Sequence, residues 1–147
     1  MHDDVGALSI AFEELVRLFR RLSPASGLSL TAASTLHRLA HDGPARLTEL
    51  ATRQGVTQPA MTQLVTRLQD AGFVERRPDS ADGRVVRVRI TDAGAAELSR
   101  RREVRTERLA VLLDRLPADE RAALFAALPA IGSLTRLAAR PREGAPL

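Results

Sequence analysis

Several residue types are missing or scarce in this chain of 147 residues. It has no cysteine, which excludes disulfides, thiol redox sensing and thiolate metal sites. It also lacks tryptophan and tyrosine, so a core must be built mainly from leucine, valine and alanine. No apolar run approaches the ~18 residues that a membrane span needs. The amino-terminal segment has neither the basic stretch nor the apolar run of a signal peptide. We therefore expect a soluble, cytoplasmic protein with no membrane partner.

Lysine is absent too, and all 22 basic residues are arginine, giving a net charge of +4. This bias is more typical of a GC-rich genome than of a function, although the planar guanidinium suits phosphate and guanine contacts. A net charge of this size is weak evidence for a nucleic-acid partner. Paired carboxylates, a nucleophile beside a base, and a phosphate-binding loop are also lacking. We expect neither an enzyme nor a cofactor.

The residues that are present have the spacing of a helix-turn-helix. Thr48 is expected to cap a helix over 49–54, and Thr57 to cap a second helix over 58–71. Gly55 permits the tight turn between them, and Gly72 ends the second helix. The inward stripe of that helix comprises Met61, Leu64, Val65 and Leu68. Upstream, we expect Arg46–Leu47 to form a short β segment, and a helix capped by Thr31 to bury Ala33, Leu36, Leu39 and Ala40.

The outward face of the second helix carries amides and hydroxyls, and residues 55–69 include no acid. A solvated surface helix usually carries glutamate or aspartate, so a merely polar surface is the less favoured interpretation. In a DNA major groove, glutamine can pair with adenine, and threonine can touch a thymine methyl group. The candidate DNA contacts from this helix are Thr57, Gln58, Pro59, Thr62, Gln63, Thr66 and Arg67.

A β-hairpin is predicted next, because residues 73–77 and 84–90 flank the turn-forming loop PDSADG and the second run alternates with a period of two. Asp82 lies two residues before Arg84 and could hold its guanidinium, aiming it at a minor groove. Arg76 is a further candidate DNA contact. Like Arg77, Arg87 and Arg89, it could meet phosphates or pair with Glu75 and Asp79.

Apolar seams mark both ends of the chain. In the first helix, residues spaced alternately by three and four form a regular seam, which favours a dimer helix over one packed on its own domain. The last helix carries a similar apolar stripe. The candidate interface residues are Val5, Leu8, Phe12, Leu15, Phe19, Leu124, Leu128, Ile131 and Leu134. His37 and His41 lie four apart and could hold a metal. No third ligand lies nearby, so we interpret them as surface or pocket histidines.

Together these features resemble the MarR (multiple antibiotic resistance regulator) family. The family's L-x-x-x-G-[LF]-V-x-R pattern matches residues 68–76, its D-x-R wing matches 82–84, and [LI]-T-x-x-G matches 90–94. The resemblance implies a homodimeric repressor of a pseudo-palindromic operator, relieved by a small, often phenolic or anionic, effector in a cleft. Two departures are Gly83, where relatives often have a basic residue, and the missing cysteine of thiol-sensing members.

The predicted fold is mainly α with a small β-hairpin wing (α+β), a winged helix-turn-helix with terminal dimerisation helices. We expect one domain over 1–147, with dimerisation helices at 4–29 and 110–140, the winged helix-turn-helix at 30–94, a connecting helix at 92–116 and a frayed tail at 139–147. Its partners would be double-stranded DNA, a second copy of the chain, and a small anionic or aromatic effector. His37 is a candidate residue for binding that effector. The alternative is a winged-helix protein–protein interaction module without specific DNA binding.

Overall fold

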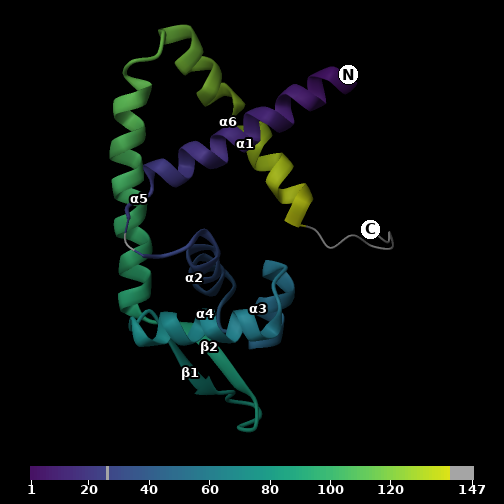
Figure 1. The fold of residues 1–147 in the computed structure, drawn as a ribbon, viewed down its shortest axis with the longest axis vertical. Helices are drawn as coiled ribbons and strands as arrows, with labels where there is room; N and C mark the ends of the chain where they lie inside the picture. Colours follow the sequence, from purple (N-terminus) through teal and green to yellow (C-terminus); the bar gives the residue numbers. More distant parts are fainter. Residues whose placement is uncertain (26, 140–147) are drawn as a thin grey trace. The chain divides into compact units, whose positions relative to one another are not determined.

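The computed structural model describes residues 1–25 and 27–139 of the chain. Six helices and two strands are formed by these residues (Figure 1). Their order is α1 (His2–Leu22), α2 (Leu30–Asp42), α3 (Leu47–Gln54), α4 (Gln58–Asp70), β1 (Val74–Pro78), β2 (Val86–Ile90), α5 (Asp92–Leu113) and α6 (Ala118–Ala139). The mainly α architecture with one hairpin is confirmed. Beyond Ala139, the expected frayed tail lies outside the described residues.

The chain divides into two compact units, residues 1–107 and the segment from Arg108 onward. The hydrophobic core of the first unit is built from α2, α3, α4 and the hairpin. Met61, Leu64, Val65 and Leu68 of α4 are all buried, as predicted from their helical spacing. Ala51 of α3 is 5% exposed, which allows the two short helices to cross closely.

The ends of α4 are fixed by its own sequence. Thr57 caps the start, because its hydroxyl accepts a hydrogen bond from the Ala60 amide at 3.3 Å. At the other end Gly72 adopts a left-handed conformation with φ 77°. This turn lets the Phe73 amide donate to the Leu68 carbonyl at 2.9 Å and lets the Gly72 amide donate to Gln69. Both predicted helix boundaries are confirmed to within one residue.

Two predicted features of α2 are wrong. The helix begins at Leu30, and its cap is Ser29, whose hydroxyl accepts from the Ala32 amide at 3.1 Å. Ala33 is only half-buried and Ala40 is exposed, because the packed face is shifted by one residue. That face comprises Ala32, Thr35, Leu36 and Leu39. The buried Thr35 was not predicted, because a search for apolar residues passes over threonine. Its hydroxyl donates a hydrogen bond to the Thr31 carbonyl at 2.8 Å.

The start of α3 also differs from the prediction. The helix begins at Leu47 rather than after Thr48, because the Glu49 carboxylate accepts from the Arg46 amide at 3.0 Å and caps that end. The expected β segment over Arg46–Leu47 is therefore displaced. Instead, Ala45 forms a β-bridge with the hairpin, through reciprocal backbone hydrogen bonds of 3.0 and 2.8 Å with Val88.

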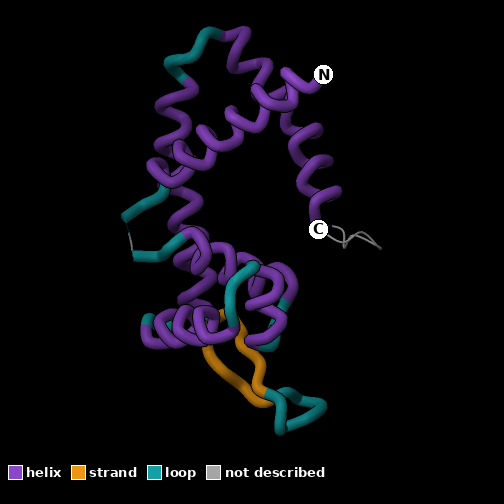
Figure 2. Tube along the Cα trace, turned by 45° about the vertical axis from the view of Figure 1, so that its right-hand side comes forward, coloured by secondary structure: helices purple, strands orange, loops and turns teal. Residues whose placement is uncertain are grey.

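The hairpin is an antiparallel pair in which Val74 faces Ile90 and Arg76 faces Val88. Figure 2 shows the strands in orange and the connecting loop at their far end. β2 begins two residues later than predicted, because Val85 belongs to the turn and donates its amide to the Asp82 carbonyl at 2.9 Å. The buried Val74, at the start of β1, and the buried Val88, in the middle of β2, anchor the hairpin to the core.

Helices α1 and α6 leave much of their apolar surface uncovered in a single chain. The exposed apolar side chains of α1 include Val5, Leu8, Leu15 and Phe19, and Phe12 is half-buried. Those of α6 include Leu124, Phe125, Leu128, Ile131 and Leu134. Among the described residues, no helix is both long enough and apolar enough to cross a membrane.

Candidate nucleic-acid interface

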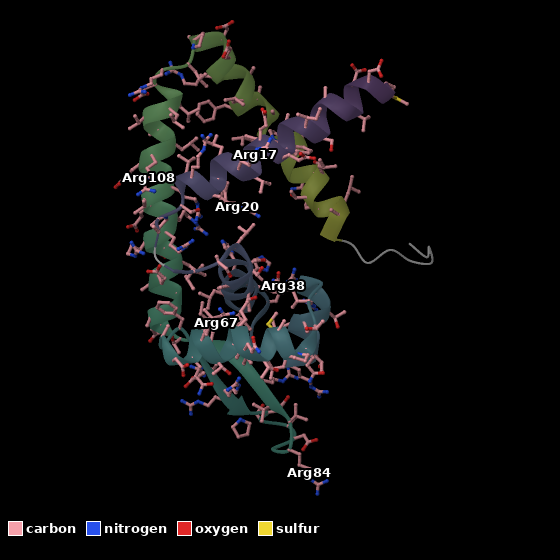
Figure 3. All side chains as sticks on the ribbon, viewed as in Figure 1. Arg17, Arg20, Arg38, Arg67, Arg84 and Arg108 are labelled. Atoms are coloured by element: carbon pink, nitrogen blue, oxygen red, sulfur yellow. The ribbon has the colours of Figure 1, made fainter. Side chains whose placement is uncertain are left out.

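The outward face of α4 is an exposed polar surface. All seven residues predicted from this helix to contact DNA are exposed: Thr57, Gln58, Pro59, Thr62, Gln63, Thr66 and Arg67. The Thr57 hydroxyl also serves as the helix cap described above. Arg67 is labelled on α4 in Figure 3. The structure therefore places these candidates together on one solvent-facing helix.

The threonine hydroxyls on this face are turned toward their own helix. Thr62 donates to the Gln58 carbonyl, and Thr66 donates to the Thr62 carbonyl, both at 2.9 Å. A hydroxyl has one proton, so neither can donate to a base without breaking this bond. Within the described part of the chain, the amides of Gln58 and Gln63 make no hydrogen bond and keep their full donor and acceptor capacity.

Arg84 lies at the tip of the wing, far along the hairpin from α4 (Figure 3). The predicted contact between Asp82 and the Arg84 guanidinium is not formed. An Asp82 carboxylate oxygen accepts from the backbone amide of Arg84 at 3.0 Å, rather than holding its guanidinium. Aspartate commonly caps the backbone two residues on, which closes the turn. No acidic group among the described residues lies within ion-pair distance of the Arg84 guanidinium, so its charge faces solvent.

Three other wing arginines pair with carboxylates. Glu75 accepts from Arg77 at 3.0 Å and from Arg89 at 2.7 Å. Asp79 pairs with Arg87, which also donates to the Pro44 carbonyl at 3.2 Å. Hydrogen bonding from Arg77 lowers the pKa of Glu75, and the Ala81 amide followed by Arg87 lowers the pKa of Asp79. Both carboxylates are therefore ionised at neutral pH and cancel most of this local positive charge.

Arg76 is half-buried and is held by α4 instead. Its guanidinium donates to the Gln69 side-chain oxygen at 2.9 Å and to the Thr66 hydroxyl at 3.1 Å. The role of Gln69 was missed by sequence reasoning. The contact depends on how the hairpin packs against the end of α4, and no local pattern carries that information.

A pocket of about 720 Å³ lies between the end of α1, α2 and α5. The lining is apolar and cationic: Phe19, Arg20, Arg21, Ser23, Pro24, Ala25, Leu28, Leu30, Ala33, Ser34, His37, Leu98, Arg101 and Arg105. No acidic residue contributes to this lining. His37 is therefore a pocket residue, in keeping with the sequence interpretation. His41 lies outside it, with its Nδ1 2.9 Å from an Asp42 oxygen.

Two arginines of α5 lie on an inward face that sequence reasoning missed. Arg101 is only 4% exposed, and it donates to the Pro24 carbonyl at 3.4 Å. Arg105 stacks on Phe19, with its guanidinium carbon 4.6 Å from the ring centroid. Burial, and then the charges of Arg101 and Arg102, lowers the pKa of Arg105. The spacing of Gly94, Leu98, Arg101 and Arg105 by four and three residues was the available signal for an inward face.

This fold and surface define a winged helix-turn-helix DNA-binding protein, and comparison with known proteins identifies the family. The MarR family matches residues 28–86. The chain is 40% identical over 114 residues to an uncharacterized HTH-type transcriptional regulator of Mycobacterium bovis, covering 78% of this chain and 80% of that protein. The chain therefore belongs to the MarR family. It is a DNA-binding transcriptional regulator and not an enzyme.

Two further relatives extend the comparison. The HTH-type transcriptional repressor IacR of Pseudomonas putida is 33% identical over 69 residues, which cover 47% of this chain and 41% of IacR. The crystal structure of RV1404 from Mycobacterium tuberculosis is similar with a TM-score of 0.72 and 26% identity, covering 88% of this chain and 92% of that one.

Proposed function

We propose that this protein is a ligand-responsive repressor that binds a pseudo-palindromic DNA site as a homodimer. The observation that carries the proposal is the acid-free, exposed face of α4, together with the solvent-facing charge of Arg84 at the wing tip. In this proposal α4 enters the major groove, where Gln58 and Gln63 present unused amides to base edges. Arg84 reaches the adjacent minor groove, and Arg67 and Arg76 contact phosphates.

Dimer formation is supported by the apolar surface that a single chain leaves exposed. Phe19 of α1 is 43% exposed, and Leu128 of α6 is 57% exposed. Apolar helix faces that are left exposed in this way mark interfaces on soluble proteins. A two-fold dimer presents its recognition helices to successive major grooves, so its half-sites lie about 10 base pairs apart, centre to centre.

Ligand response is supported by the cationic pocket. Four arginines, His37 and the Phe19 ring line a largely apolar cavity, and no acidic residue contributes to its lining. The buried Arg101 and the half-buried Arg105 favour an anionic ligand, and the ring and the leucines favour an aromatic or apolar body. Repression is supported by the likeness to IacR, which is named a transcriptional repressor.

The experiment that tests this function is a binding titration at several salt concentrations, using DNA selected from a random pool. Wild-type protein should prefer selected DNA over random DNA by at least about 10³-fold. Gln63→Ala should lose roughly 5- to 150-fold at one position of each half-site, which corresponds to about 1–3 kcal/mol for a base contact. The control is Arg102→Ala, an exposed change on α5, which should bind as the wild type does. Equal affinity for selected and random DNA would overturn the proposal.

A further inference from the structure

The two wing strands carry four arginines, and their neighbours divide them into two groups. Arg77, Arg87 and Arg89 each pair with a carboxylate, supplied by Glu75 or Asp79. An ion pair fixes a guanidinium, but it also cancels the charge that would attract a phosphate. These three arginines are therefore better suited to shaping the wing than to binding DNA.

Arg76 is fixed without being neutralised. Its two contacts in the described structure are the Gln69 amide oxygen at 2.9 Å and the Thr66 hydroxyl at 3.1 Å. Both acceptors are uncharged, and no acidic group of the described residues lies within ion-pair distance of Arg76. The guanidinium is thus held in place while it keeps its full positive charge.

The hydroxyl of Thr66 is committed to this arrangement. Its proton is donated to the Thr62 carbonyl at 2.9 Å, so a lone pair is left to accept from Arg76. Thr66 and Gln69 lie three residues apart, on one face of α4. The pair forms a fork that engages two of the five guanidinium N–H groups and leaves the others available to a DNA phosphate.

We propose that Gln69 and Thr66 are positioning residues that preset Arg76 as a phosphate contact beside the recognition helix. The inference rests on the DNA-binding surface proposed above. Presetting helps because an arginine that is already ordered loses less side-chain entropy when DNA binds. Neutral acceptors help because binding strength and its salt dependence both follow the number of phosphates that are neutralised.

Replacing Gln69 with glutamate separates positioning from charge. Gln69→Glu keeps the acceptor geometry and strengthens the contact with Arg76, but it neutralises the guanidinium. We expect thermal stability equal to or above wild type, with about tenfold weaker DNA binding and a log-affinity against log-salt slope shallower by about one unit. Arg76→Ala should give the same loss of slope. Ser99→Glu, which adds the same charge on an exposed part of α5, is the control and should bind nearly as the wild type does.

A double-mutant cycle tests whether Gln69 acts through Arg76. Gln69→Ala alone should weaken binding by about two- to fivefold with the salt slope unchanged, because the arginine is still charged but no longer held. In the Arg76→Ala background the same change should have no effect. Thr66→Val, which removes the hydroxyl but keeps the shape, should behave like Gln69→Ala, and Thr66→Ser should restore binding.

Three results would overturn the inference while leaving the DNA-binding function intact. The first is a Gln69→Glu variant whose affinity for DNA, and whose slope of log-affinity against log-salt, are the same as those of the wild type. The second is an equal loss from Gln69→Ala in both backgrounds, which would mean that Gln69 touches DNA itself. The third is a Thr66→Ser variant that binds as weakly as Thr66→Val. A wild-type protein that shows no salt-dependent DNA binding would instead remove the proposed function.

Discussion

Gly94→Ala should be among the most damaging single-methyl changes in the protein. A Cβ at this position would lie 2.2 Å from the Phe73 carbonyl oxygen and 2.8 Å from a side-chain carbon of Ile90. Ordinary van der Waals contact begins near 3.4 Å, so the new methyl is more than 1 Å too close to a backbone atom. Because a backbone carbonyl cannot rotate away as a flexible side chain can, α5 itself must move.

That movement strains the junction between α4, β1 and α5. The Phe73 carbonyl accepts from the Thr91 amide at 3.0 Å, and the Thr91 hydroxyl donates to the Gly72 carbonyl at 2.6 Å. Overpacking costs about 1–3 kcal/mol. A weakened hydrogen bond adds about 1 kcal/mol. The better helix propensity of alanine offsets about 1 kcal/mol. We therefore expect a net loss of about 1–3 kcal/mol, or roughly 2–12 °C in Tm for a chain of this size.

Thermal unfolding followed by circular dichroism, at equal protomer concentrations, measures this effect. The matched control is Gly83→Ala in the wing turn, where a Cβ meets no heavy atom within 4 Å and φ lies outside the left-handed region. There alanine should leave Tm unchanged or raise it slightly, because it restricts the unfolded chain. If the two variants have Tm values within about 1 °C of each other, the close packing of α5 against the Phe73 carbonyl is wrong.

Three other predictions concern the wing and the interface. Arg84→Ala should keep the wild-type Tm, weaken DNA binding and make the salt slope shallower by up to about one unit; unchanged affinity in a salt titration would refute the wing-tip assignment. The double variant Phe12→Glu/Leu15→Glu places charge in the proposed dimer interface and should yield monomeric or unfolded protein by analytical ultracentrifugation; a stable dimer would remove α1 from the interface. The pKa of Asp79 is lower in the folded wing than in the unfolded chain, where it is about 4. The ionised carboxylate therefore stabilises the fold above a pH of about 4, and this stabilisation is lost as the pH falls through the pKa of the folded state. The stability difference between wild type and Asp79→Asn should therefore be constant from pH 7 to 5 and shrink in more acid solution, and a difference that grows on acidification would contradict the sign.

Local patterns were sufficient to predict the recognition helix. The stripe from Met61 to Leu68, the Thr57 cap and the Gly72 terminus all depend on side chains within a few residues of one another. Such short-range physics can be read directly from a sequence. The alternation of apolar and polar residues in β2, together with the turn-forming residues before it, similarly predicted the hairpin. Asp82, however, binds the backbone amide of Arg84 and not its side chain.

Contacts between distant segments could not be predicted in the same way. Glycine is required at position 94 because the carbonyl of Phe73, 21 residues earlier in the chain, leaves no room for a side chain. Arg101 is buried against the loop that contains Pro24, 77 residues earlier. The hold of Gln69 on Arg76 depends on how a strand meets the end of a helix. In each case the chemistry of the residue was visible in the sequence, but the partner was set by tertiary packing.

The most direct test of the central claim is to determine which DNA the intact protein selects from a random pool, in parallel with its Gln63→Ala variant. The wild type should enrich an inverted repeat whose half-sites are about 10 base pairs apart, centre to centre. The variant should enrich the same repeat with one position in each half-site relaxed. Selection of a site without two-fold symmetry, or of no sequence at all, would contradict a dimer that reads DNA through α4.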